Sequence, residues 1–204
     1  MRVSNAGRIR PVAGIALLLL PLAAGLSSCG SRAATSDTFD LTAISVADGA
    51  GARNRQILVP EPSALKMIGG DQIVIRVSPT EVQYLARSQW SDSLPRLVQS
   101  RLVESLESTG KLGGVGKPGQ GLAIDYQVVS EIRAFEVVVG GGTRAHIEIA
   151  VKILNDRDGT VRRQRVFQAY APVRGPGNVA YVDGLNSAFA AVTKDIVDWT
   201  LQSV

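Results

Sequence analysis

The sequence TRAHIEIAVKIL, residues 143–154, decides the fold of this chain. Its apolar side chains stand at every second position: Ala145, Ile147, Ile149, Val151 and Ile153. Arginine, histidine, glutamate and lysine fill most of the positions between them. Because successive side chains of a β-strand point to opposite faces, this alternation predicts a strand with one buried and one polar face. Other elements must therefore cover one face of its sheet.

Two further strands are predicted beside this one, across turn sequences. A glycine run at residues 140–142 separates it from an apolar segment at 122–139, whose period slips near 134–135 and so predicts a β-bulge. On the other side, the turn sequence at 158–159 precedes a third segment at 161–170. The three segments predict an antiparallel meander.

Shorter strands are predicted nearer the N-terminus, at residues 57–59, 73–77 and 81–86. The last two are separated by Ser78-Pro79-Thr80, which predicts a hairpin turn. Residues 45–56 lack a clear period and are predicted to form a loop.

Two segments carry the 3.6-residue period of amphipathic helices. The first starts at Leu94 and stops at Gly110, with Asp92 or Ser93 as its cap. The second starts at about Tyr181, and its apolar stripe consists of Val182, Leu185, Phe189, Val192, Ile196 and Trp199. Each helix has one apolar stripe, which can be buried against one flat surface such as the face of a sheet. The predicted fold class is therefore α+β: a two-layer sandwich, with a mostly antiparallel sheet and two amphipathic helices on one face.

Residues 1–28 have the order of a bacterial lipoprotein signal peptide: basic residues, an apolar run at 12–20, and then Leu26-Ser27-Ser28-Cys29. These four residues resemble a lipobox. In such signals the cysteine thiol receives a diacylglycerol, the chain is cut before the cysteine, and the new amino group is often acylated, for example with palmitate. The alternative is a transmembrane anchor with an incidental cysteine. Nine apolar residues between two prolines are too few for it, because a spanning helix needs roughly 20.

Cleavage before Cys29 leaves 176 residues, enough for one domain with its own core. Residues 29–37 are predicted to form a flexible tether, and its small and polar part, residues 30–37, reaches about 27 Å at most at ~3.4 Å per residue. Residues 38–204 are the predicted periplasmic domain. The discarded segment holds three arginines and no acidic residue, so the formal net charge falls from +4 to +1. This balance gives no indication of nucleic-acid binding.

The chain has few residues that could bind a metal ion or form a disulfide. Cys29 is the single cysteine, and acylation of its thiol leaves none for a disulfide or a thiolate metal site. His146 is the single histidine, so a zinc site would need an unusual number of carboxylates. We expect no metal and no cofactor.

The glycine-rich run 113–121 is the one stretch that invites comparison with a phosphate-binding loop. It contains Gly116-Lys117, but Lys111 and Pro118 stand where that motif needs glycine and serine or threonine. It also follows a predicted helix and precedes a strand, the reverse of the required order. A flexible connection is the favoured interpretation.

Catalytic motifs are equally weak. His146 lies on a polar strand face and the chain has no nucleophile-elbow sequence, which indicates an ordinary surface histidine. The carboxylate pairs Glu104/Glu107 and Asp195/Asp198 fall on the polar sides of the predicted helices, where solvated charges are usual. We expect that the chain is not an enzyme.

Two apolar features are candidates for contacts with a partner or a lipid. Val137, Val138 and Val139 lead into the glycine turn, so at least one of them should face outward at a hairpin tip. Tyr84 and Trp90 lie just before the first helix. Core packing is the favoured interpretation of both features, and a contact surface is the alternative.

Several of these segments occur together in the order found in one family. They are Ile73-Val74-Ile75-Arg76, the strand at Gln83-Tyr84-Leu85, the helix start Gln89-Trp90-Ser91-Asp92-Ser93-Leu94, and the hairpin at 156–159 followed by 162–167. With the lipobox, they resemble the ABC-type transport auxiliary lipoproteins, the lipoprotein partners of MCE-domain lipid transporters of the Pqi type and of Mla-like systems. The resemblance covers most of residues 38–204, and the block 84–94 is its most specific part.

The resemblance implies a non-enzymatic component of the bacterial cell envelope. Its implied partners are an MCE-domain protein, a permease and an ATPase, which together would move phospholipid or another hydrophobic substrate. Acyl chains on Cys29 would anchor the protein in a membrane. Gly30, directly after the cysteine, favours the inner leaflet of the outer membrane, facing the periplasm. Whether the protein forms a homo-oligomer stays open at this point.

A second hypothesis comes from a different class of protein. It is a structural assembly lipoprotein for an outer-membrane barrel, of the kind that serves lipopolysaccharide assembly on a similar sandwich. The partners would distinguish the two hypotheses, because an MCE subunit is expected for the first and a barrel protein for the second.

Overall fold

The structure, a computed structural model, describes residues 36–45 and 51–204. The predicted signal peptide, Cys29 and all but the last two residues of the predicted tether lie outside the described residues. The described elements are, in chain order, β1 (Asp37–Phe39), β2 (Ala52–Leu58), β3 (Ser63–Ala64), β4 (Gln72–Ser78), β5 (Glu81–Trp90), α1 (Leu94–Ser108), β6 (Leu112–Gly116), β7 (Tyr126–Val138), β8 (Arg144–Asn155), β9 (Val161–Pro172) and α2 (Asn178–Leu201). β1 thus begins at the last residue of the predicted tether.

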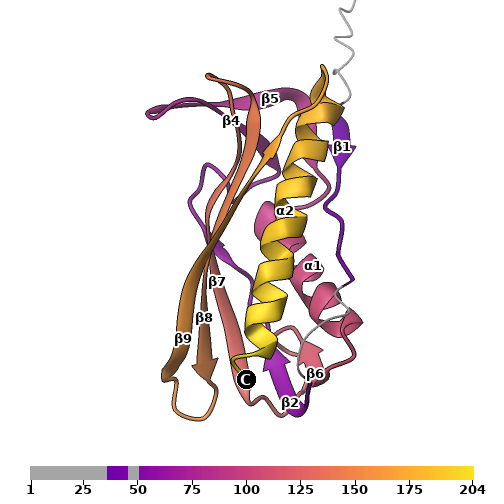
Figure 1. Ribbon diagram of the computed structural model, residues 1–204, viewed down its shortest axis with the longest axis vertical. Coiled ribbons are helices and arrows are strands. Elements are labelled where there is room, and N and C mark those ends of the chain that lie inside the picture. Colours follow the sequence, from indigo (N-terminus) through magenta and orange to yellow (C-terminus); the bar gives the residue numbers. More distant parts are fainter. Residues whose placement is uncertain (1–35, 46–50) are drawn as a thin grey trace, which may run out of the picture. The chain divides into compact units, whose positions relative to one another are not determined.

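The sheet is organised around β7 (Figure 1). Along one edge, β8 pairs with β7 in an antiparallel ladder, and β9 continues antiparallel from β8. Along the other edge, β2, β3 and β4 pair in parallel with the first, middle and last parts of β7. β6 extends the sheet from β2, and β5 and β1 extend it from β4. The long ladders are antiparallel and the parallel ones are short, so the predicted mostly antiparallel sheet is confirmed.

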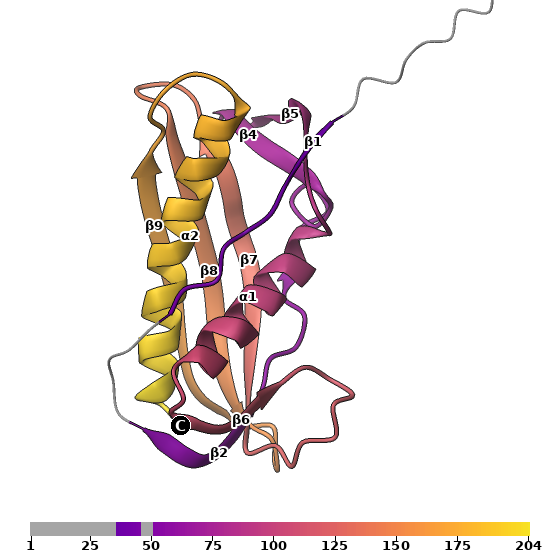
Figure 2. The same ribbon diagram turned by 90° about the vertical axis from the view of Figure 1, so that its right-hand side faces the viewer.

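Both helices lie on one face of this sheet, as the sequence predicts (Figure 2). α2 packs along β8 and β9, and α1 packs against β6 and α2. The alternating apolar residues of β8 are all at most 1 % exposed. The six residues of the predicted α2 stripe are also buried, and the helix begins three residues before Tyr181. The two-layer α+β sandwich is therefore confirmed.

Aromatic side chains join the two layers. Phe135 of β7 packs edge-on against Trp90 of β5 and tilted against Phe189 of α2, with both ring-centroid distances 5.8 Å. Near the other end of α2, Trp199 packs edge-on against Phe167 of β9 at 5.5 Å. Such pairs add about 0.5–1.5 kcal/mol each beyond the burial of their area. They fix the position of α2 along its length.

Most predicted connections agree with the structure. β7 and β8 form the hairpin across the glycine run 140–142, and their register shifts between Ile132 and Ala134, which confirms the predicted bulge. β4 and β5 form the second predicted hairpin. Ser93 is the N-cap residue of α1, although its side chain makes no capping hydrogen bond.

Two predicted loops are strands instead. Residues 52–56, predicted as part of a loop, belong to β2, and the start of the glycine-rich run belongs to β6, which pairs in parallel with β2. The physical reason is close approach of the two backbones. A Cβ atom at Gly113 would lie 2.5 Å from the carbonyl oxygen of Arg53, so this pairing requires a glycine. The prediction of a flexible connection is wrong for residues 113–116.

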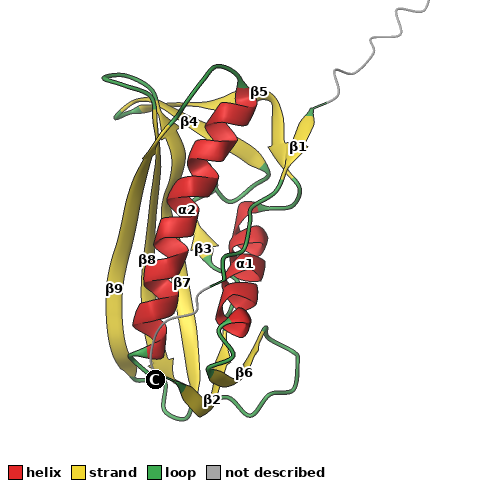
Figure 3. Cartoon of the chain, turned by 45° about the vertical axis from the view of Figure 1, so that its right-hand side comes forward, coloured by secondary structure: helices red, strands yellow, loops and turns green. Residues whose placement is uncertain are grey.

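Residues 40–45 form a strap over the outer side of the helix layer, between α1 and α2 (Figures 2 and 3). The backbone N–H of Thr42 donates to Oδ1 of Asn186 on α2 at 3.0 Å, and that of Ile44 donates to Oγ of Ser105 on α1 at 3.1 Å. Leu41 inserts into the core and is 2 % exposed. The strap therefore ties both helices to the chain that enters from β1.

A charged network holds the start of the strap. Arg101 of α1 donates to Asp40 at 2.8 Å and to Glu104 at 2.9 Å. Burial acts to lower the pKa of Arg101, but its hydrogen bonds to these two carboxylates outweigh the burial, so the pKa is raised.

Candidate interaction surface

The face of the sheet opposite the helices carries two ordered rows of side chains. Residues paired across adjacent strands lie on the same face. The first row runs from β5 to β9 through Tyr84, Val74, Glu136, His146 and Tyr170. The second row, one step nearer the glycine hairpin, consists of Val82, Arg76, Val138, Arg144 and Pro172. No described helix covers these rows, and we call them together the ladder surface.

An ion pair forms the centre of the ladder surface. Arg76 donates three hydrogen bonds to Glu136. Its Nε lies 3.1 Å from both carboxylate oxygens, and its Nη2 lies 2.8 Å from Oε2. Glu136 is only 5 % exposed, so its charge is satisfied almost entirely within the protein. Removing one partner from such a pair leaves an uncompensated buried charge, which is strongly destabilising. The pair therefore fixes the register of β4 on β7.

His146 extends this centre towards the edge of the sheet. Its Nδ1 lies 3.9 Å from Oε1 of Glu136. Its ring stacks on that of Tyr170, with centroids 4.4 Å apart and planes 7° from parallel. The guanidinium of Arg144 lies over the same tyrosine ring at 4.7 Å. Nε2 of His146 is buried and accepts or donates no hydrogen bond within the described part of the chain.

These contacts hold the side chains in the middle of the first row in place and leave the rings of Tyr84 and Tyr170 accessible. Tyr84 at one end of the first row is 43 % exposed and Tyr170 at the other end is 50 % exposed. Between them, both oxygens of Glu136 are bound by Arg76, so this carboxylate is not available as a base. The surface thus has an accessible aromatic ring at each end and a charged centre that is neutralised within the protein.

The structure separates the residues that the sequence suggested as contacts. Tyr84 is exposed on the ladder surface, and Val138 and Val139 are half-buried. Trp90 is 2 % exposed and Val137 is fully buried. For Trp90 and Val137 the burial agrees with core packing, the favoured interpretation, and not with the alternative of a contact surface.

His146 also departs from its prediction. It lies on the polar face of β8, as expected, but its side chain is only 15 % exposed because Tyr170 covers the ring. The structure therefore contradicts the prediction of an ordinary surface histidine. The sequence pattern could not reveal this, since the partner ring comes from the next strand.

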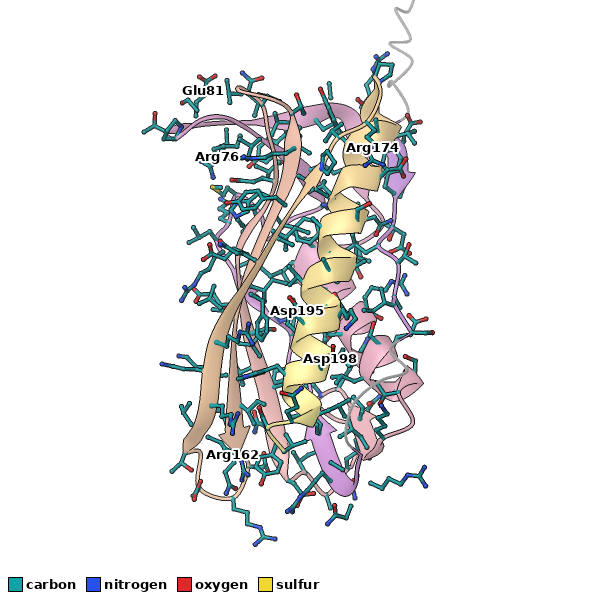
Figure 4. The ribbon with its side chains drawn as sticks, viewed as in Figure 1. Arg76, Glu81, Arg162, Arg174, Asp195 and Asp198 are labelled. Atoms are coloured by element: carbon teal, nitrogen blue, oxygen red, sulfur yellow. The ribbon has the colours of Figure 1, made fainter. Side chains whose placement is uncertain are left out.

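The carboxylate pairs on the helices remain separate from the ladder surface. Glu104 pairs with Arg101 and Asp198 pairs with Lys194 at 2.7 Å. Figure 4 shows Asp195 and Asp198 along α2, on the opposite layer from Arg76. Within residues 36–45 and 51–204, no group of histidine, cysteine and acidic side chains is arranged to hold a metal ion.

None of the described helices is long and apolar enough to cross a bilayer.

An open pocket of about 340 Å³ lies between the start of α2 and the end of β9, with Arg174, Asp183 and Ser187 in its lining. The hydroxyl of Ser187 donates to the backbone carbonyl oxygen of Asp183 at 2.8 Å.

Sequence reasoning missed the outer strand β9 as a surface. Val161, Val166 and Tyr170 are each 46–50 % exposed, and all three lie on this strand. The signal was present in the segment 161–170, where apolar residues occur on both faces of a predicted strand. Its position at the edge of the sheet could not be inferred from periodicity alone.

The sandwich and its ladder surface define an α+β domain with a candidate docking face. The chain belongs to the family of the ABC-type transport auxiliary lipoprotein component, whose profile matches residues 39–197. This confirms the family resemblance seen in the sequence.

Individual proteins are also similar to this chain. An uncharacterized protein of Bradyrhizobium diazoefficiens is 28 % identical over 179 residues, which is 86 % of this chain but 47 % of that protein. The chain thus spans about half the length of this relative. The crystal structure of a Xanthomonas campestris protein is similar with a TM-score of 0.76 and 26 % identity, covering 82 % of this chain and 96 % of the other.

A more distant structure shares the fold alone. A hypothetical protein of Chlamydia trachomatis is 10 % identical, with a TM-score of 0.51 over 73 % of this chain and 97 % of its own.

Proposed function

We propose that this protein is a lipid-anchored auxiliary subunit of an ABC/MCE-type transporter that moves phospholipid or another hydrophobic substrate across the bacterial envelope. Family membership over residues 39–197 is the observation that carries the proposal. The lipobox-like sequence at Cys29 supports acylation of that residue, and Gly30 after it supports the outer membrane as the site of anchoring.

In this proposal the protein acts by binding and not by catalysis. Its partners are the MCE-domain protein, the permease and the ATPase of one transport system. The ladder surface supports a docking role, because its polar centre is neutralised internally while Tyr84 and Tyr170 stay accessible. Aromatic side chains of this kind are enriched at protein interfaces.

The position of the chain entry is consistent with such docking. β1, where the chain enters the domain, lies at the same end of the sandwich as the hairpin between β4 and β5 (Figure 1). The two rows of the ladder surface are next to that hairpin and to the glycine hairpin. A partner bound there would meet the end of the domain that is closest, along the chain, to Cys29.

The anchor is tested by metabolic labelling with radioactive palmitate in cells that express the full chain. Cys29→Ala should abolish labelling and leave an unprocessed or mislocalised precursor. Ser28→Ala is the matched control, because a small residue before the cysteine is retained and labelling should persist. Membrane fractionation then shows which membrane holds the labelled protein, and recovery in the inner membrane would contradict the proposed location.

The partners are tested by affinity purification of the acylated protein in detergent, followed by mass spectrometry of proteins and bound lipids. Recovery of an MCE subunit with its permease and ATPase is the expected result. Recovery of an outer-membrane barrel protein without an MCE subunit would overturn the proposal and favour an assembly lipoprotein.

A further inference from the structure

The outermost strand β9 has a free edge. Among the described strands it pairs with β8 alone, over 12 residues. Its first six residues, 161–166, are all exposed. A strand edge of this kind presents unpaired backbone N–H and C=O groups, which can pair with another extended chain.

The two faces of β9 carry different chemistry. Val166 pairs with Ala150 and Tyr170 with His146, so both project from the uncovered face of the sheet. Arg163 pairs with Ile153 and Arg165 with Val151, so both arginines project from the helix side. The edge is therefore apolar on one face and cationic on the other.

The cationic face is held in place by aromatic rings. The guanidinium of Arg165 lies 5.0 Å from the centroid of the Phe167 ring. At the register shift that begins the strand, Arg162 donates to Oη of Tyr126 at 2.9 Å and lies over its ring. Figure 4 shows Arg162 near the start of β9. Within the described part of the chain, none of these arginines forms an ion pair with a carboxylate. The aromatic rings hold the guanidinium groups in position, and no described carboxylate neutralises their charges.

Two occupants of this edge can be compared by charge. A second copy pairing antiparallel through the exposed first half of β9, centred on Gln164, would place Arg163 opposite Arg165, and like charges in directly opposite positions are destabilising. A partner strand with carboxylates on the helix side would instead place opposite charges across from Arg163 and Arg165. Arginine pairs well with carboxylates because its planar group donates two parallel hydrogen bonds.

We propose that β9 is a strand-addition site for an extended segment of a partner protein in which acidic residues alternate with apolar ones. The backbone of the segment extends the sheet. Its acidic side chains lie opposite Arg163 and Arg165, and its apolar side chains pack beside Val166 and Tyr170. The inference rests on the edge and its charges, and it holds whichever transport system the protein serves.

The test uses a fluorescently labelled eight-residue peptide of alternating glutamate and valine, and a second peptide with lysine in place of glutamate. Fluorescence anisotropy should show about tenfold tighter binding of the glutamate peptide, the amount expected from two cross-strand ion pairs. Hydrogen exchange of the β9 amides should slow when this peptide is bound. Raising the salt concentration should weaken its binding.

Two variants separate recognition from general charge. Arg163→Glu with Arg165→Glu should abolish the preference for the glutamate peptide or reverse it. Arg157→Glu with Arg174→Glu is the matched control, because it makes the same change in net charge at two exposed arginines outside the ladder between β8 and β9, and it should leave the preference unchanged. Circular dichroism verifies that each variant is folded.

Three results would overturn the proposal. They are equal binding of the two peptides, unchanged exchange of the β9 amides, and an unaltered preference in the folded double variant. If the double variant aggregates while its peptide preference is unaltered, the arginines only protect the strand edge, as charges on edge strands commonly do.

Discussion

The two faces of β8 are ordered by different forces. On the covered face, Ile147, Ile149 and Ile153 are fully buried beneath the helices. On the uncovered face, His146 stacks on Tyr170, and order depends on contacts between neighbouring strands. Burial of apolar area is non-directional and large, whereas the contacts of the uncovered face are pairwise and geometric. The covered face therefore supplies most of the stability, and the uncovered face sets which groups are presented.

The largest expected effect comes from the covered face. Phe189→Ala removes a fully buried ring that packs against Phe135, and it should lower the free energy of unfolding by about 3–5 kcal/mol. Urea denaturation measures the loss. Val179→Ala on the same helix is the control, because Val179 is 61 % exposed and the change should stay within about 0.5 kcal/mol. Equal effects of the two variants would contradict the division between the faces.

A smaller effect is expected at the centre of the ladder surface. Arg76→Met leaves Glu136 buried without its cation, and the free energy of unfolding should fall by about 3 kcal/mol. Adding Glu136→Leu removes the stranded charge, so the double variant should recover more than half of that loss. Chemical denaturation of the two single variants and the double variant gives the coupling energy. If the two losses simply add, the pair does not have the role assigned to it.

The smallest effect is expected in the turn between β8 and β9. The backbone N–H of Thr160, and then its hydroxyl, donate to Asp158 and lower its pKa below the ordinary 3.8. A lowered folded-state pKa stabilises the protein above about pH 4, and this contribution is lost as the pH falls through the folded pKa. Asp158→Asn should therefore be less stable than the parent at pH 6, with a gap that narrows at pH 3. Thermal unfolding at the two pH values measures the gap, and a gap that widens in acid would contradict the assignment.

Much of the fold could be predicted because its signals are local. The alternation in β8, the stripe of α2 and the glycine hairpin each depend on residues close together in the sequence, and the structure confirms all three. The bulge in β7 was predicted for the same reason, since a slip in period is visible within one strand.

What could not be predicted depends on partners distant in the sequence. β6 was interpreted as a loop because glycines usually mark turns, and only the approach of β2 shows why Gly113 is needed. The ion pair between Arg76 and Glu136 joins residues 60 positions apart. For Trp90 the sequence favoured core packing but left a contact surface open, because an aromatic ring can serve a surface as well as a core. Its burial and its contact with Phe135 decide for the core.

The strap over the helices has a mechanical consequence. Any pull on the chain from its N-terminal side enters the domain through β1 and then reaches residues 40–45. β1 is an edge strand of the sheet and pairs with β5, so the sheet receives the load first. Residues 40–45 are bonded to α2 through Asn186 and to α1 through Ser105, so they pass the remaining load to both helices. Tension at the entry is thus divided between one edge of the sheet and the helix layer.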